Sequence, residues 1–347
     1  KRRLSLTRGN KGIERAPFFD TDHNMEIWVD QVSWKLEEPK IEFDMILNDD
    51  KARFESKNFF RDFNYERLRR GMMSYNPIAK MYKFSIDWRR DSFDLKEYAF
   101  AIGSKKENLY QQIYMLADEG FIYYDHETEV VQIKEKLYNY YKNHFKLADY
   151  DVIRFVSVIG ALPNATLNLV NYDLQLEGVR LFHFSDSQNV QVIPRNQQVT
   201  LKNDRRLKFG GRITAGRFDF YGNNFDFNYP GFYINSEQID SMKLFYPDST
   251  GGKYLIPVKT VLRDLNGTLY IDKPRNKSGI QDYPEYPRFV SRSPAVISYD
   301  KKNIFNGAYK KDVFRFEVDP FTIDSMDNFT IEGLTFPGNF VSAGILP

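Results

Sequence analysis

The fold of this chain is decided by residues 206–227, whose sequence is RLKFGGRITAGRFDFYGNNFDF. Apolar and polar residues alternate in three short segments, 207–209, 217–220 and 224–227. Alternation with a period of two predicts strands that bury one face, and the glycines and asparagines between the segments predict turns. The stretch therefore predicts a mainly β fold class.

The same pattern extends over residues 152–245, where apolar pairs recur every six to nine residues. Such regular corners predict a β-solenoid-like fold, in which coils of short strands stack on one another. Gly210, Gly211 and Gly216 are its expected tight corners, and a β-sandwich with long loops is the alternative. The residues expected to point inward are Leu174, Leu176, Val190, Val192, Val199, Leu201, Leu207, Phe209, Ile213, Phe218 and Phe220.

Composition limits the class of protein further. The 347 residues include 30 Phe and 23 Tyr, which favour the pleated surface of a sheet. A net charge of +2 gives no overall attraction to nucleic acid or anionic membranes. The absence of cysteine excludes disulfides, thiolate metal sites and cysteine nucleophiles. The sequence has no apolar run long enough for a transmembrane helix, and both ends have the character of cuts, so we expect a fragment of a larger protein.

Three segments are expected along the chain: a β-rich segment at 1–91, a helical unit at 92–146, and a β-solenoid-like domain at 147–347. In the first segment, alternation predicts strands at 25–34, 41–47 and 52–55, a turn at 48–50, and a short helix at 65–70 ended by Gly71. In the third, the proline-containing residues 247–312 are expected to form long ordered loops around the β core. Strands are expected again at 313–318 and 329–332.

The middle segment has a different periodicity. Ser104 and Glu107 fit a capping box, followed by a helical face with Leu109, Ile113 and Leu116. Residues 121–133 predict a β-hairpin, and helices are expected before it at 95–101 and after it around 137–144. Helix, helix, hairpin, helix is the order of a winged-helix-like insertion.

Catalytic patterns are missing from the sequence. His23, His126, His144 and His183 lack the spacing of a metal site, and neither a P-loop nor a nucleophile elbow occurs. Asp319, Asp324 and Asp327 could supply paired carboxylates, but their spacing does not place two on one strand face. We therefore expect no enzyme, no cofactor and no metal, with a carbohydrate-active β-solenoid enzyme as the alternative.

A second alternative is nucleic-acid binding by the winged-helix-like unit, which would use the helix expected at 107–119. It carries Glu107, Asp118 and Glu119, with positive charge only at Lys105 and Lys106. This face matches phosphate poorly, so we expect the unit to contact a protein or to have a purely structural role, and we expect no nucleic-acid partner.

Aromatic residues are dense between 218 and 233. Strand alternation buries only about half of such rings, so the others must meet loops of the same protein or a partner. The candidates for partner binding are Phe218, Phe220, Tyr221, Phe225, Phe227, Tyr229, Phe232 and Tyr233.

Three stretches of the C-terminal half, residues 209–218, 265–274 and 318–325, carry a resemblance. They are similar to large uncharacterised exported or cell-envelope proteins of Bacteroidetes-type bacteria. The resemblance implies a location in the cell envelope, the periplasm or outside the cell, and an extended β scaffold. The function expected from the sequence is thus a non-enzymatic scaffold or binding protein, whose partner is a protein or another envelope component.

Overall fold

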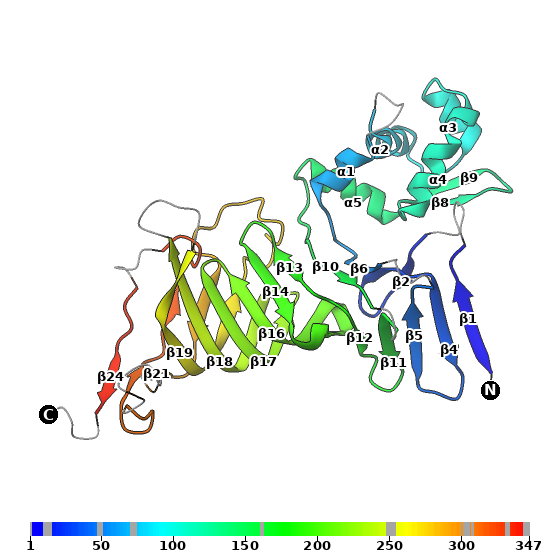
Figure 1. The fold of residues 1–347 in the computed structure, drawn as a ribbon. Helices are drawn as coiled ribbons and strands as arrows, with labels where there is room; N and C mark the ends of the chain where they lie inside the picture. The colour runs from blue at the N-terminus through cyan, green and yellow to red at the C-terminus, as the bar shows by residue number, and fades with distance from the viewer. Residues whose placement is uncertain are drawn as a thin grey trace. The chain divides into compact units, whose positions relative to one another are not determined.

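The computed structural model describes residues 2–9, 16–46, 51–69, 75–159, 163–247, 255–298, 300, 306, 309–329 and 334–342. The chain divides into two compact units, Lys1–Glu177 and Gly178–Pro347. Antiparallel strands dominate both units, and the helices gather between residues 62 and 144 (Figure 1). The fold is therefore mainly β, as the alternating pattern predicts.

The first unit contains two antiparallel sheets. One has the strand order β1 (Arg3–Thr7), β4 (Gln31–Lys35), β5 (Lys40–Asp44), β11 (Ala165–Asn168), β12 (Leu174–Leu176). The other has the order β10 (Arg154–Ser157), β6 (Ala52–Ser56), β3 (Met25–Trp28), β2 (Phe18–Asp20). The single strand expected at 25–34 is therefore two strands in different sheets. The chain bends at Asp30, whose carboxylate accepts a hydrogen bond from the Ile46 backbone N–H at 3.0 Å.

A helical module completes the first unit. It contains α1 (Asp62–Arg67), α2 (Pro77–Trp88), β7 (Ser92–Asp94), α3 (Leu95–Ala101), the 3₁₀ turn η2 (Lys106–Asn108), α4 (Tyr110–Asp118), β8 (Ile122–Asp125), β9 (Val130–Ile133) and α5 (Glu135–His144). Strand β9 pairs with both β7 and β8. The expected helices, the hairpin and the buried face of Leu109, Ile113 and Leu116 are confirmed.

The expected start of the α4 helix is wrong. Helix α4 begins at Tyr110, after η2, and the Ser104 hydroxyl donates to the Lys105 carbonyl instead of capping the helix. The extra 3₁₀ turn separates Ser104 from the first helical N–H groups. Gly71, the turn at 48–50 and all but Phe329 of the strand expected at 329–332 lie outside the described residues.

The second unit is a run of antiparallel strands. Strands β14, β16, β17, β18 and β19 are neighbours in that order, β13 pairs with β14, and β15 pairs with β16. The bounds are β13 Phe182–Ser185, β14 Val190–Pro194, β15 Val199–Lys202, β16 Arg206–Ala215, β17 Phe218–Asn228, β18 Tyr233–Pro247 and β19 Leu255–Tyr270. Strands β20 (Arg288–Ser291) and β21 (Ala295–Ser298) pair with β19. Three further strands follow, β22 (Arg315–Val318), β23 (Thr322–Ile323) and β24 (Gly338–Val341). Strand β22 pairs with β21 and β24, and β23 pairs with β20.

This pairing corrects the solenoid prediction. Strands β16 to β19 have between 10 and 16 residues each and run antiparallel, whereas a solenoid needs short parallel strands. Gly210 and Gly211 are not corners: they lie at a bulge inside β16. A Cβ on Gly211, where φ is +133°, would lie 2.3 Å from the Ile193 carbonyl oxygen. Strand β19 also replaces part of the loop expected at 247–312.

The prediction of the buried residues is confirmed in both units. All eleven residues expected to point inward are buried: Leu174 and Leu176 belong to the first unit and the other nine to the second. Alternation therefore identified the buried face correctly, although it did not reveal the direction of strand pairing.

Candidate functional site

The eight aromatic residues proposed for partner binding do not form an exposed surface. Phe218, Phe220, Phe225, Phe227, Tyr229 and Phe232 are buried, and Tyr221 and Tyr233 are partly exposed. The rings contact one another and neighbouring strands, for example Phe220 with Phe289 at 4.9 Å between centroids. These side chains form the interior of the second unit, which corrects the prediction of a partner surface there.

A different aromatic surface lies on helices α2 and α5. We define the α2–α5 surface as Tyr82, Ile86, Tyr138, Tyr141 and Phe145. Tyr82 stacks on Tyr141, with centroids 3.8 Å apart and planes 9° apart, and Tyr141 contacts Phe145 at 4.7 Å. Ile86 is 55% exposed and Phe145 49% exposed. Spacings of three and four residues place these side chains on one face of each helix.

A hollow with cationic side chains adjoins one end of this surface. It measures about 570 Å³ and is lined by Ser85, Ile86, Arg89, Arg90, Asp91 and Tyr138. The Arg90 guanidinium is paired with Glu97 at 2.5 Å. Arg89, at the C-terminal end of α2, is exposed and forms no ion pair with a described residue. This end of the surface therefore offers the exposed guanidinium of Arg89 beside apolar side chains.

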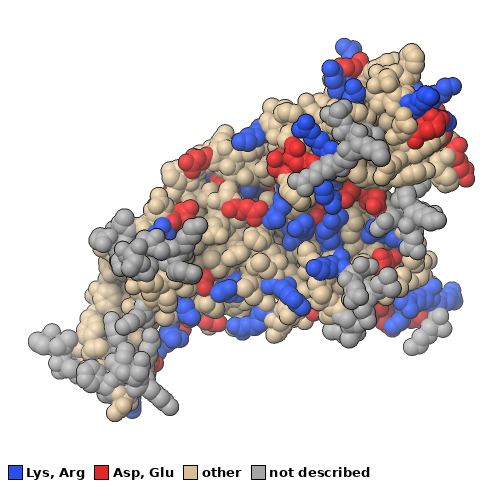
Figure 2. Space-filling model, turned by 45° about the horizontal axis from the view of Figure 1, so that its top comes forward, with Lys and Arg blue, Asp and Glu red and all other residues tan. Residues whose placement is uncertain are grey.

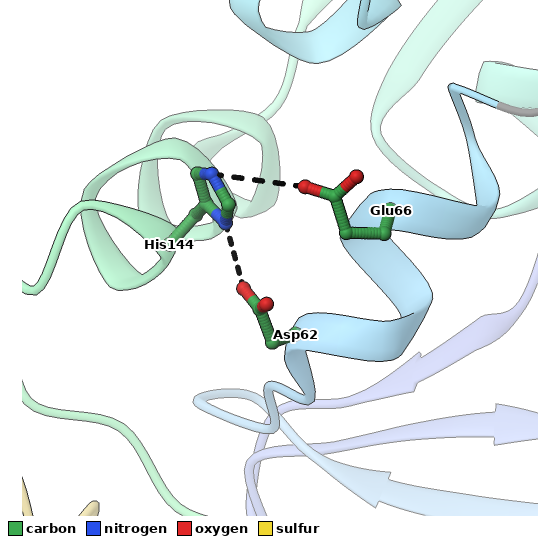
Figure 3. A group of neighbouring side chains, drawn as sticks. All are labelled: Asp62, Glu66 and His144. Atoms are coloured by element: carbon green, nitrogen blue, oxygen red, sulfur yellow. Dashed lines mark hydrogen bonds and ion pairs between the residues drawn. The ribbon is translucent and has the colours of Figure 1, made fainter.

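The other end of the surface meets a cluster of three titratable side chains, shown in Figure 3. Asp62 and Glu66 lie on successive turns of α1, and His144 reaches them from the end of α5. His144 Nδ1 lies 2.6 Å from Asp62 Oδ1, and Nε2 lies 3.9 Å from Glu66 Oε1. The His144 ring also stacks on Tyr65, with centroids 4.0 Å apart. Burial raises the pKa of Tyr65 to about 12, and the nearby Tyr141, Glu66 and Asp62 add to the rise.

These three residues have the donor atoms of a metal site, because one imidazole nitrogen and two carboxylate oxygens lie within 4.8 Å of one another. The two carboxylates, however, approach different nitrogens of the same ring (Figure 3). One ion at Nε2 would use Glu66 and leave Asp62 as the group that orients the imidazole. As it stands, the cluster ties α1 to α5. The i, i+4 spacing of Asp62 and Glu66 could have indicated that these two side chains are neighbours, but not that His144 meets them.

A second ionic cluster is buried between strand β6 and the helical module. Glu55 is 3% exposed and faces Glu26 on the neighbouring strand. Burial raises the pKa of Glu55, and Arg53, Lys136 and Arg154 counteract the rise. The Lys136 ammonium contacts Glu26 Oε2 at 2.5 Å and the Glu119 carbonyl at 2.9 Å. The cluster joins the sheet to α5, and its members Glu26 and Lys136 also line a hollow of about 210 Å³.

The remaining histidines and carboxylates singled out in the sequence are dispersed. His23 is buried, and its Nδ1 lies 2.8 Å from Asp20 Oδ2. His183 pairs with Asp186 at 3.3 Å. His126 is exposed in the β8–β9 turn. Asp324 pairs with Arg288 at 2.8 Å. Within the described ranges, Asp62, Glu66 and His144 are the one group of three acidic or histidine residues with converging ligand atoms.

The charge on the surface is mixed. Lys and Arg are interspersed with Asp and Glu on the face in Figure 2. On α4, the outward side chains include Gln111 and Tyr114, and Lys106 before it is engaged by Glu129 at 2.7 Å. Helix α4 therefore offers little positive charge to phosphate.

Comparison with known proteins gives no match to a protein-family model, to a curated protein or to a solved structure. Among the helices of the described residues, none has both the length and the apolar character needed to span a membrane.

Proposed function

We propose that this chain is a non-enzymatic binding or scaffold protein of the bacterial cell envelope or exterior, which contacts a partner protein through the α2–α5 surface. The observation that carries the proposal is this partly exposed aromatic surface, with Ile86 and Phe145 about half in solvent and the exposed guanidinium of Arg89 at its edge. Exposed rings provide rigid contact area at low entropic cost. The envelope location rests on the resemblance of the C-terminal half alone.

The topology of the module supports the proposal of a winged-helix-like unit used for protein contact. In support are the order α2, β7, α3, α4, β8, β9 and the pairing of β7 with β9, which a winged helix would have as well. In DNA-binding versions, the helix in the position of α4 enters the major groove and phosphates are met by Lys and Arg. Here Gln111 and Tyr114 occupy the outward face, so the geometry favours a protein over DNA.

The chemistry of the surface defines the partner. Lys83, Arg89 and Lys142 are exposed on α2 and α5 around the aromatic side chains. A segment with apolar anchors and flanking acidic residues would bury the rings and pair with these cations. The partner is therefore expected to be a protein with an acidic, amphipathic segment.

The test is capture of envelope proteins by the full chain and by two variants, Ile86→Ser and Phe145→Ser. Both variants should lose a captured protein that the native chain retains, because each removes an exposed anchor without opening a core. Phe100→Ser on α3 is the matched control, since Phe100 is 86% exposed outside the surface, and it should retain capture. Equal capture by all four chains, or release of sugars from an envelope polysaccharide by the native chain, would contradict the proposal.

A further inference from the structure

The second unit contains a polar pocket that the proposed function does not use. It measures about 400 Å³ and is formed by three segments: the turn after β13, the chain between β19 and β20 (gold in Figure 1), and the turn after β23. The side chains that define its chemistry are Gln281, Asp282, Tyr283, Tyr286, Asp327 and Asn328.

A buried hydrogen-bond network fixes the walls of this pocket. Asp272 is 1% exposed and accepts hydrogen bonds from Gln188 Nε2 at 2.7 Å and from Asn276 Nδ2 at 3.0 Å. Asn276 in turn donates to the Gln281 carbonyl at 2.9 Å and accepts from the Gln281 backbone N–H at 2.9 Å. The chain leading to Gln281 and Asp282 is thus held in place before any ligand arrives, which lowers the entropic cost of binding.

The opposite wall is fixed by backbone contacts. The Ser325 N–H donates to the Glu285 carbonyl and the Met326 N–H to the Pro287 carbonyl, both at 3.1 Å. These bonds tie the turn that carries Asp327 and Asn328 to the segment that carries Asp282 and Tyr286. Two carboxylates, three amides and two phenol rings therefore line one preorganised hollow.

The lining selects among classes of ligand. It contains neither Lys, Arg nor His, so it is unsuited to an anion, and nearly every side chain carries a hydrogen-bonding group, so it is unsuited to a lipid. A lone cation is disfavoured as well, because Asp282 and Asp327 are not part of a three-ligand cluster among the described residues. Carboxylates and amides can each bond two neighbouring hydroxyls, and tyrosine rings cover C–H faces.

We propose that this pocket binds a neutral sugar unit of a glycan, with Asp282 and Asp327 accepting from its hydroxyls and Tyr286 packing against it. The site binds without cleaving. It is independent of the α2–α5 surface, so the chain would hold a protein at one unit and a glycan at the other.

The proposal is tested by titrating the full chain with neutral trisaccharides of glucose, mannose and N-acetylglucosamine, followed by calorimetry and saturation-transfer NMR. Binding of one of them is expected, with a loss of about tenfold or more in affinity in Asp282→Asn, Asp327→Asn and Tyr286→Ala. Asp312→Asn, an exposed carboxylate of the same unit outside the pocket, should bind as the native chain does. Circular dichroism checks that each variant is folded.

Four outcomes would overturn the proposal. The first three are no binding of any of the trisaccharides, binding that the three pocket variants leave unchanged, and binding of calcium alone with no sugar. Reducing ends released from the bound trisaccharide would also overturn it, because the pocket would then be catalytic.

Discussion

At the scale of single residues, Glu55 shows how the sheet and the helical module are joined at an electrostatic cost. Its carboxylate is buried on β6, with Arg53 Nε 3.4 Å and Arg154 Nη1 3.8 Å from Oε1. These distances exceed those of short charge-assisted hydrogen bonds. Desolvation of the carboxylate therefore outweighs the attraction of its neighbours, and the pKa of Glu55 is raised.

A raised pKa makes the stability depend on pH in a definite direction. The folded chain keeps the Glu55 proton to higher pH than the unfolded chain, so this group costs stability as the pH rises through its folded pKa. Glu55→Gln removes that cost, and we expect the free energy of unfolding at neutral pH to rise, by about 1 kcal/mol or more. Urea unfolding at neutral and mildly acidic pH measures it.

The exposed Glu107 provides the control for this experiment. Glu107→Gln should change the free energy of unfolding little at either pH, because the side chain is in solvent. If Glu55→Gln instead lowers stability at both pH values, the ion pairs to Arg53 and Arg154 outweigh the cost of burial.

At the scale of elements, the packing of α4 gives the most direct test of the module. Leu116 is fully buried in a core that includes Leu109, Ile113 and Tyr124. Leu116→Ala should therefore lower the free energy of unfolding by about 2–5 kcal/mol, since it removes buried methyl groups and leaves a cavity. Tyr114→Ala on the same helix, where the ring is 39% exposed, should cost clearly less. Denaturant titration measures both, and a cost below about 0.5 kcal/mol for Leu116→Ala would show that its side chain is exposed.

The elements also show why the sequence predicted some features and not others. Alternation in residues 206–227 identified the buried face, but a period of two is common to parallel and antiparallel strands. Pairing direction depends on the partner strand, and Gly211 is a bulge only because the Ile193 carbonyl approaches it from β14. A pattern within one segment contains no information about that neighbour.

The candidate site was missed for a related reason. The start of helix α2 can be predicted from the sequence, because Asn76 caps it and Pro77 is its first residue. The Ile78 backbone N–H donates to Asn76 Oδ1 at 2.9 Å. The aromatic surface, however, needs Tyr82 of α2 against Tyr141 of α5, almost sixty positions apart in the sequence. The cluster of Asp62, Glu66 and His144 likewise depends on how α1 packs against α5.

At the scale of the whole molecule, the aromatic residues are divided between two uses. Most described phenylalanines of strands β13 to β18 in the second unit fill its interior, as Phe218 and Phe227 do, whereas Phe340 of β24 is 43% exposed. In the first unit, part of the aromatic content stays outside, with Phe145 and Trp88 each nearly half exposed. Aromatic content alone thus indicated β structure, while the surface that we propose for a partner lies on the helices.

The last prediction concerns nucleic acid and follows from the charge of the whole chain. A net charge of +2 with both signs interspersed on the face in Figure 2 leaves few counterions to release on contact with DNA. Duplex DNA should show no measurable binding at physiological ionic strength, and any binding at low salt should fall away quickly as salt is added. Fluorescence anisotropy with a labelled duplex over a range of salt concentrations measures this.

The variant Lys105→Glu, changed just before α4, is the control. It should leave the result unchanged, because one exposed lysine does not make a phosphate-binding face. Tight binding at physiological salt that Lys105→Glu abolishes would show that α4 contacts DNA, and the module would then be a nucleic-acid reader.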